Sequence, residues 1–269
     1  KVDRDIIGAW VDAAAQAGYR RTGDYNREDQ EGVGFFQMTM KNGMRCSAAA
    51  AYLKPIRSRK NLHIITRAHT DKIEFDGKRA IAVMTRVRGK SQRIKAGREI
   101  ILSAGSIGSP QILMLSGIGD QNDLGKHGIT ATHHLPGVGR NLQDHLQARP
   151  VFKCNASTIN TETKNPLQLA SIALEYAFKR SGPMAMAASL GTAFLKTHEG
   201  LETPDIQFHL QPFSADRVAE GSHKFSAFTA SVLQLRPESV GHLELVSADA
   251  ADYPAIYPNY LATKTDCDT

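Results

Sequence analysis

Cysteine is scarce in this chain, and long apolar runs are missing from it. Its 269 residues include three cysteines, Cys46, Cys154 and Cys267, which lie far apart and form no Cys-x-x-Cys pair. Such spacing argues against a disulfide framework and against a zinc site, and it favours a reducing compartment. No apolar run approaches the roughly 18 residues that a membrane-spanning helix needs, so we expect no spanning segment.

Charge of one sign is not concentrated anywhere in the sequence. Lysine and arginine number 33 against 27 aspartate and glutamate, a formal net charge of +6. The basic residues are scattered and no aromatic ladder accompanies them, so we expect no nucleic-acid partner. The histidines show no metal-ligand spacing, so we predict no metal site. Hydrophobic residues at 41% and charged residues at 22% are ordinary globular values, which excludes disorder, collagen and coiled coil.

The spacing of apolar residues predicts a mixture of helices and mainly antiparallel strands. We expect helices at 5–17, 47–53 (ended by Pro55) and 166–179, and strands at 62–66, 72–75, 80–87, 93–95, 98–102, 205–210, 225–235 and 242–246. Turn signals separate the strands up to residue 95, which predicts a small meander. The apolar run within 98–102 is continuous, which is typical of a buried strand. Residues 19–42 predict a long, functional loop, and a change of domain is expected between about 146 and 166.

A turn of small residues follows the predicted strand 98–102. Residues 103–109 (SAGSIGS) are broken only by Ile107, and Ser109 and Pro110 suit the N-cap and first position of a helix. Such a turn lets a cofactor approach the backbone, and a helix start favours anionic groups. Close packing of strand on helix explains the small residues equally well, so both interpretations stay open.

Other candidate segments are less specific. The Gly-x-Gly sequences at 117–119 and 137–139 lack the third glycine of a dinucleotide fingerprint, and neither a Gly-x-Ser-x-Gly elbow nor a P-loop occurs. Asp144 and His145 could form an acid–base pair, although a structural hydrogen-bonding role is favoured for adjacent residues. The loop 24–36 combines carboxylates, amides and glycines, and it could line a ligand cavity or be a solvated surface loop.

Several of these segments together resemble the glucose–methanol–choline (GMC) family of flavin-dependent oxidoreductases. Residues 105–119 (GSIGSPQILMLSGIG) resemble the second signature of that family at every specified position. Further similar segments are 137–145 (GVGRNLQDH), 30–34 (QEGVG), 45–47 (RCS) with 51–53 (AYL), and 257–261 (YPNYL). The resemblance covers nearly the whole chain and is strongest to the choline dehydrogenase and long-chain alcohol dehydrogenase branch.

This resemblance implies an α/β (α+β) fold that binds FAD. It implies a partial FAD-binding, Rossmann-like domain with a β-meander at 1–150, and a partial antiparallel-sheet substrate domain at 151–269. By resemblance, Thr70 meets the adenine through its backbone, where many relatives carry valine. Ser103, Ala104 and Gly105 fall beside the adenosine part of FAD, in agreement with the small-residue turn.

The implied activity is oxidation of a CH–OH group, in a primary alcohol or choline, by hydride transfer to the flavin. The Gly-x-Gly-x-x-Gly unit and the catalytic histidine of the family are expected N-terminal to Lys1 and C-terminal to Thr269, so this chain is expected to be the central part of a longer enzyme. No catalytic residue is therefore predicted within it, and the chain alone is expected to be inactive.

A small-molecule alcohol is the expected partner, and the electron acceptor is left open. We expect a cytoplasmic location, with peripheral attachment to the inner membrane as an open alternative. Two rival functions remain. One is a truncated, non-catalytic relative that folds but binds no flavin. The other is a nicotinamide-dependent Rossmann enzyme, which the meander and the missing fingerprint disfavour.

Overall fold

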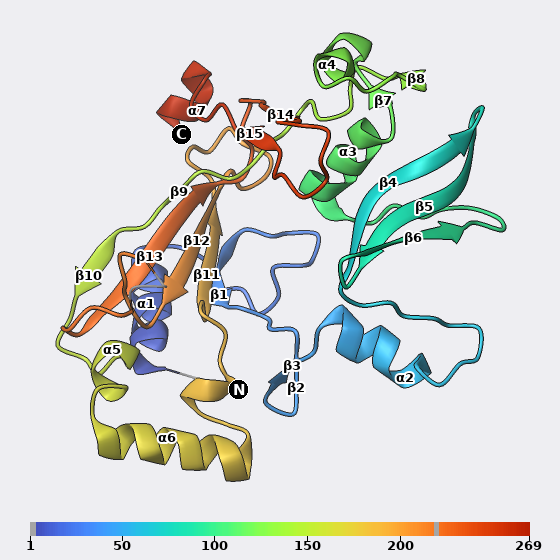
Figure 1. Ribbon diagram of the computed structural model, residues 1–269. Coiled ribbons are helices and arrows are strands. Elements are labelled where there is room, and N and C mark those ends of the chain that lie inside the picture. Colours follow the sequence, from blue (N-terminus) through green and yellow to red (C-terminus); the bar gives the residue numbers. More distant parts are fainter. Residues whose placement is uncertain (1–3, 218–220) are drawn as a thin grey trace. The chain divides into compact units, whose positions relative to one another are not determined.

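The computed structural model describes residues 4–217 and 221–269, which form two compact units (Figure 1). The first, here the sheet unit, comprises Lys1–Arg59, His145–Arg236 and Thr269, and the second, the meander unit, comprises Lys60–Asp144 and Pro237–Asp268. Each unit is thus assembled from separated stretches of chain, whereas the sequence suggested one division after residue 150. The assignment of FAD binding to 1–150 and substrate binding to 151–269 stays a prediction.

The sheet unit is built on a six-stranded antiparallel sheet (Figure 1). Its order is β1-β11-β12-β13-β10, and β9 also pairs with β13. The strands are β1 (Gly32–Phe35), β9 (Gln147–Ala148), β10 (Val151–Lys153), β11 (Gly191–Leu195), β12 (Ile206–Gln211) and β13 (Ala227–Gln234). The strands predicted at 205–210 and 225–235 are therefore confirmed, and they lie side by side in the middle of the sheet.

Helix α1 (Asp5–Gln16) covers one face of this sheet, which confirms the helix predicted at 5–17. Its buried residues Ile7 and Val11 pack on buried side chains of β1, β11, β12 and β13. The ring of Trp10 lies 6.2 Å from that of Phe208 on β12. Because side chains alternate along a strand, His209 points to the opposite face of the sheet.

The first strand of this sheet lies inside the region predicted as a long loop. β1 is buried and pairs with β11 along its whole length. The glycines that suggested a loop serve another purpose, because a Cβ at Gly34 would overlap the carbonyl oxygen of Thr22. Because these glycines have no side chains, residues 20–22 can lie close to β1. The N–H of Val33 donates to the carbonyl oxygen of Arg20 (2.8 Å), and the N–H of Thr22 donates to the carbonyl oxygen of Val33 (2.8 Å).

The remaining elements of the sheet unit lie around the sheet. They are β2 (Met40–Lys41), β3 (Met44–Arg45), the π-helical turn η1 (Ala49–Leu53), α2 (Lys54–Ile56), α5 (Ile159–Glu162), α6 (Pro166–Lys179) and η2 (Pro183–Ala185). Pro55 was expected to end the helix of 47–53, and this was wrong. A separate short helix, α2, follows η1 directly and ends at Ile56, and Pro55 lies in its first turn, where the missing N–H of proline is tolerated.

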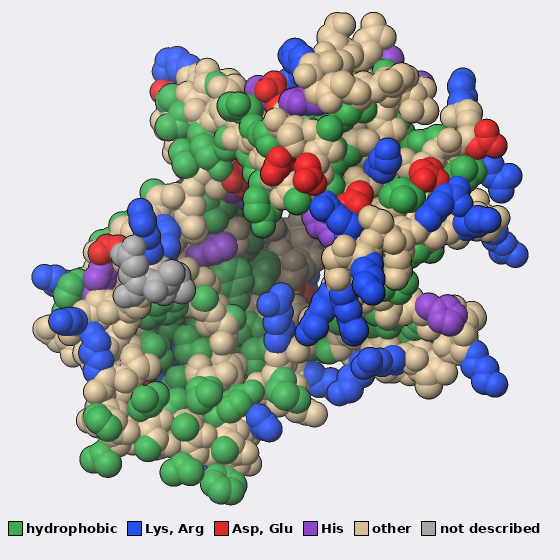
Figure 2. Space-filling model, in the orientation of Figure 1, with side chains coloured by type: hydrophobic (Ala, Val, Ile, Leu, Met, Phe, Trp, Pro, Cys, Tyr) green, Lys and Arg blue, Asp and Glu red, His purple; other side chains and the backbone are tan. Residues whose placement is uncertain are grey.

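Helix α6 agrees with its predicted range of 166–179. The Asn165 side chain caps it by accepting hydrogen bonds from the N–H groups of Leu167 and Gln168, and Arg180 ends it in the left-handed conformation. Most of its apolar residues are exposed, and hydrophobic side chains gather over it in Figure 2. Within the described ranges, no helix combines the length and hydropathy needed to cross a membrane.

The meander unit contains the three antiparallel strands predicted before residue 96. These strands pair in the order in which they occur in the chain: β4 (Ala68–Asp76), β5 (Arg79–Val87) and β6 (Lys90–Lys95). Arg88 and Gly89 both have positive φ in the turn between β5 and β6, as a tight hairpin turn requires. The other elements are α3 (Gly105–Leu115), β7 (Ile118–Gly119), α4 (Gln121–Lys126), β8 (His133–His134), β14 (His242–Glu244), β15 (Ala255–Tyr257) and α7 (Lys264–Asp268).

Two predicted strands of this unit do not form. Residues 62–66 and 98–102 belong to none of the sheets in the described part of the chain. Several of their apolar side chains are exposed instead: Ile64 is 45%, Ile65 50% and Ile101 80% exposed. An apolar run favours a buried strand only where a neighbouring strand supplies backbone hydrogen bonds, and the described residues supply none here.

Helix α3 also begins earlier than the sequence suggested. It starts at Gly105, which has φ of 81°, and Pro110 lies inside it. Ser109 was predicted as the N-cap, and this was wrong. Ser109 lies inside the helix, and its hydroxyl accepts a hydrogen bond from the N–H of Ala104 (3.1 Å), the residue before the helix begins. The first turn of α3 therefore contains the small residues that precede Ser109.

Candidate functional site

The four residues predicted to contact FAD all lie in the meander unit. Thr70 is half-buried on β4, paired with Thr85 on β5. Ser103, Ala104 and Gly105 are exposed at the start of α3. A Cβ built on Gly105 would meet no atom within 4 Å. The turn is therefore open beside Gly105, where a ligand could approach the backbone, whereas a Cβ at Gly108 would lie 3.2 Å from that of Ala104.

A hydrogen bond ties α3 to the strand that carries Thr70. The hydroxyl of Ser116, which follows α3, accepts from the N–H of Ile73 (2.8 Å) and donates to the carbonyl of Ile112 (2.5 Å). Ser116 is itself buried. This contact fixes the helix against β4, the strand on which Thr70 lies.

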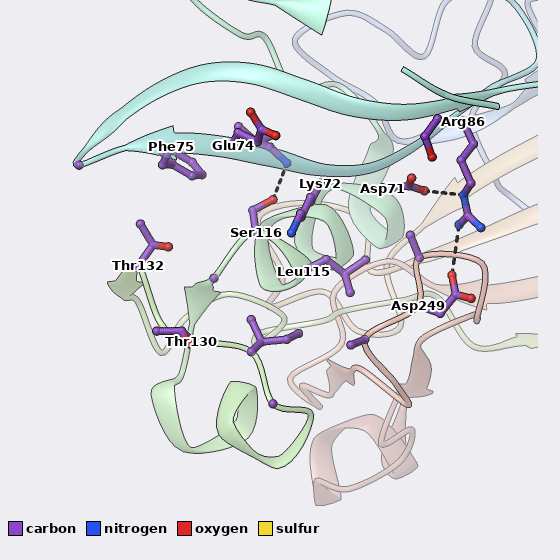
Figure 3. Close-up of a pocket in the computed structure, with 18 residues that line it drawn as sticks. Asp71, Lys72, Glu74, Phe75, Arg86, Leu115, Ser116, Thr130, Thr132 and Asp249 are labelled. Atoms are coloured by element: carbon purple, nitrogen blue, oxygen red, sulfur yellow. Dashed lines mark hydrogen bonds and ion pairs between the residues drawn. The ribbon is translucent and has the colours of Figure 1, made fainter. Parts of the chain in front are cut away.

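The same unit contains an open pocket of about 1200 Å³ (Figure 3). Its charged side chains bind one another, because Arg86 donates to Asp71 (2.8 Å) and to Asp249 (3.1 Å). The Asp71 bond is the main cause that raises the pKa of Arg86, and the N–H of Ala251 is the main cause that lowers the pKa of Asp249. None of the four residues predicted to contact FAD lines this pocket. The ion pairs of Arg86 with Asp71 and Asp249 join β4, β5 and the loop at 248–250.

A different kind of pocket, about 720 Å³ in volume, lies in the sheet unit. Five of the seven methionines of the chain line it: Met38, Met40, Met44, Met184 and Met186. Phe36, Tyr176 and three alanines add further apolar surface. A mostly apolar concavity with a few placed polar groups is the usual form of a small-molecule site. This methionine pocket is the candidate substrate site.

His209 is one of the polar residues that line the methionine pocket. On β12 it stands opposite Thr192 of β11 and Ser231 of β13, which are both fully buried. Residues directly opposite in antiparallel strands share a face, so this face of the sheet is polar. The Ser231 hydroxyl has no hydrogen-bond partner among the described residues, and it does not line the methionine pocket.

Burial controls the protonation of His209. Loss of solvent lowers the pKa of its imidazole below the ordinary 6.5, and the nearby His145 lowers it further. The ring lies 5.1 Å from that of Phe36 in an edge-on arrangement. At neutral pH the imidazole is therefore uncharged, and it can donate one hydrogen bond and accept another.

Two candidates from the sequence have other partners in the structure. The Asp144 carboxylate accepts a hydrogen bond from the Tyr260 hydroxyl, which raises the pKa of Tyr260. This favours the structural role of Asp144 over an acid–base pair with His145. In the loop 24–36, the Asp24 carboxylate accepts from the N–H of Asn26 (3.0 Å), the main cause of its lowered pKa, and from Gln37 (3.0 Å).

Residues 25–31 of that loop line a cavity of about 350 Å³ together with Lys196 and residues 202–204, and its last residue, Phe36, lines the methionine pocket. Sequence reasoning did not identify this pocket or His209. A usable signal existed, because Met38, Met40 and Met44 cluster in one segment and Met184 and Met186 in another. Nothing in either segment alone shows that the two meet.

A family model described as GMC oxidoreductase matches residues 4–147, just over half of the chain. The chain belongs to the GMC oxidoreductase family. The resemblance drawn from residues 105–119 and the other motifs is thereby confirmed. The match includes Thr70 and 103–105, whose individual roles stay predictions.

Curated GMC relatives match nearly the whole chain. It is 41% identical over 266 residues to the mitochondrial choline dehydrogenase of Homo sapiens, an alignment that covers 99% of this chain and 45% of the human protein. It is 38% identical over 261 residues to the oxygen-dependent choline dehydrogenase of Vibrio vulnificus (strain YJ016), covering 97% and 47%. The chain therefore spans about half the length of these relatives.

Solved structures agree with the fold of this GMC chain. Pyridoxine 4-oxidase from Mesorbium loti superposes with a TM-score of 0.82 at 24% identity, over 99% of this chain and 50% of the other. A formate oxidase gives a TM-score of 0.84 at 20% identity, over 98% and 51%. At such identities the likeness concerns the fold alone, and it confirms the predicted α+β class with antiparallel sheets.

Proposed function

We propose that this chain is the central part of an FAD-dependent oxidoreductase that oxidises the CH–OH group of a primary alcohol or choline. Family membership supports the reaction class. The observation that carries the proposal is the methionine pocket, where an apolar wall faces the uncharged imidazole of His209. An alcohol needs both, because its carbon chain favours apolar contacts and its hydroxyl needs a hydrogen-bond partner.

The residues at the start of α3 fit the adenosine part of FAD. Ser103, Ala104 and Gly105 offer an exposed backbone with no bulky side chain, and the space beside Gly105 is open. Thr70 would add a backbone contact from β4. Bound FAD would supply the hydride acceptor, and the protein would supply position and electrostatics.

In the sheet unit, His209 would hold the substrate hydroxyl by a hydrogen bond. The methionines and Phe36 would enclose the carbon chain and exclude water from it. No residue of the chain is assigned the removal of the hydroxyl proton.

The flavin-binding part of the proposal is tested by Ala104→Trp. An indole on the open turn would fill the space in front of Gly105, so we expect the complete protein that contains this chain to lose its bound flavin, measured by visible absorbance after purification. Ala262→Trp, at another exposed alanine of the same unit, is the matched control and should keep it. Unchanged flavin content in the Ala104 variant would refute the assignment. A colourless but folded unsubstituted protein would favour a relative that binds no flavin.

We also propose that the protein is cytoplasmic and attached peripherally to the inner membrane through α6. All three cysteines are free, in keeping with a reducing compartment. Leu167, Leu174 and Phe178 are 82%, 58% and 84% exposed, and their spacing places them on one stripe of the helix. Lysines and an arginine flank this stripe at Lys164, Lys179 and Arg180. An exposed apolar stripe between cations suits an anionic lipid surface.

Vesicle co-sedimentation tests this location. The protein should pellet with vesicles that contain anionic lipid, and the double variant Leu174→Glu/Phe178→Glu should remain in the supernatant. Tyr253→Glu is the control, because Tyr253 is 90% exposed but lies outside α6, and it should pellet like the unsubstituted protein. Equal pelleting of all three proteins would remove α6 from the attachment.

A further inference from the structure

The lining of the methionine pocket carries information on which alcohol it accepts. Among the described residues that line it, none is aspartate or glutamate, and Arg45 supplies a positive charge at its exposed edge. His209 is the other ionisable base, and it is held uncharged by burial. The pocket therefore offers no negative charge to a cationic substrate, and its one fixed charge would repel a cation.

An aromatic cage could replace a carboxylate in binding a quaternary ammonium group, but the pocket does not provide one. It has two aromatic residues besides His209, namely Phe36 and Tyr176. The ring of Tyr176 is already occupied, because the guanidinium of Arg180 lies 4.9 Å from its centre.

The ring of Phe36 is packed by other rings rather than left open for a cation. Tyr25 contacts it at 6.0 Å and His209 at 5.1 Å between ring centres, both at nearly right angles. A cage needs several ring faces around one cation, and a single ring does not make one. The two means by which proteins bind choline are thus both missing from the described lining.

We propose that the methionine pocket selects uncharged alcohols with an apolar or aromatic body and rejects choline, although choline dehydrogenases are among the closely similar relatives. The inference rests on the proposed function, since it names the substrate class of the same site. Methionine side chains are unbranched and polarisable, so they adapt to apolar groups of different shapes. Five of them in one pocket favour tolerance of chain length and ring size.

A matched pair of probes separates charge from shape. Choline is compared with its uncharged isostere, in which a carbon atom replaces the quaternary nitrogen, and benzyl alcohol and octanol extend the series. Binding is measured by calorimetry on the protein with and without flavin, and reduction by the anaerobic loss of oxidised flavin absorbance. We expect the isostere to bind at least about tenfold more tightly than choline, a difference of roughly 1.4 kcal/mol.

Two substitutions at exposed edges of the pocket sharpen this test. Met184 is 55% exposed, so Met184→Glu adds a carboxylate without burying it. We expect choline affinity to rise about tenfold and isostere affinity to fall. Met184→Leu is the control and should preserve the preference for the isostere. Arg45→Gln removes the repelling charge and should improve choline binding by about threefold, as expected for a solvent-screened charge.

Choline binding as tight as that of the isostere would overturn the inference, and so would an unchanged preference in Met184→Glu. The proposed function fails separately, if the full-length, flavin-loaded enzyme that contains this chain is reduced by none of the alcohols. In that case the calorimetric comparison still decides whether the pocket prefers an uncharged body.

Discussion

The two pockets differ in what their polar groups do. In the meander unit, the pocket of Figure 3 is larger, but its Arg86 is already bound to Asp71 and Asp249. In the methionine pocket, the imidazole of His209 is uncharged because burial lowers its pKa. Volume alone would select the first pocket. The state of the polar groups selects the second, because a site must keep hydrogen-bonding capacity for its ligand.

The difference also follows from how each pocket is built. The charged pocket joins β4, β5 and the loop at 248–250, and its ion pairs connect segments that are distant in sequence. In the methionine pocket, His209 lies on the sheet face opposite to α1, whereas Met38 and Met186 pack against the core cluster that contains Ile7 of α1. Ion pairs hold the charged pocket together, whereas the packing of α1 on the sheet supports the methionine pocket.

The largest effect on stability is expected from a substitution in β1, the strand that leads into the methionine pocket. Gly34→Ala would drive a Cβ into the Thr22 carbonyl, which should lower the free energy of unfolding by about 3 kcal/mol. Because β1 leads directly into Phe36, binding of apolar alcohols should fall with it. Urea denaturation and calorimetry measure the two effects.

Gly8→Ala is the matched control for that substitution. A Cβ at Gly8 would meet no atom within 4 Å, and alanine favours a helix over glycine by roughly 0.5–1 kcal/mol. The variant should be equally stable or more stable. If Gly34→Ala were as stable as Gly8→Ala, the close approach of residues 20–22 to β1 would be unimportant.

A smaller effect is expected from the protonation of His209. Its pKa is lowered in the folded protein, so between that pKa and the ordinary 6.5 the unfolded chain binds a proton that the folded protein does not. Stability should therefore be complete above about pH 6.5 and fall as the pH is lowered through this window. His209→Gln should show a shallower loss in urea denaturation measured at several pH values. An identical slope in both proteins would contradict burial as the cause.

The smallest effect is expected in the charged pocket. Arg86→Met removes the partner of Asp71 and Asp249, and it should lower stability by less than Gly34→Ala because these groups are partly exposed. Binding of apolar alcohols should be unchanged, since the methionine pocket lies in the other unit. Loss of that binding would show that the two pockets are not independent. Arg79→Met, on an exposed residue of the same strand, is the control.

Elements with strong local signals could be predicted from the sequence. α1, α6 and the strands of the meander have clear periodicity, and glycine or asparagine marks their ends. Strand β1 and its partner β11 could not be predicted. The glycines of β1 suggest a loop, and only the approach of residues 20–22 gives them a structural role.

The candidate site divides in the same way. Thr70 and 103–105 were named from a motif, because a contiguous signature identifies a family without any knowledge of packing. The methionine pocket was not predicted, since its lining comes from residues 36–45, 176–189 and His209. Their meeting depends on strand pairing over long sequence separations.

The amino-acid sequence by itself determined the family, the helices with regular periodicity and the turns of the meander. These follow from local propensity and from the exact order of residues in a motif. Only the tertiary structure decided that Ile101 is exposed, that Arg86 is already paired, and that five methionines line the same pocket as His209. Burial, pairing and pKa depend on neighbours brought together by folding, and no linear spacing specifies which neighbours those are.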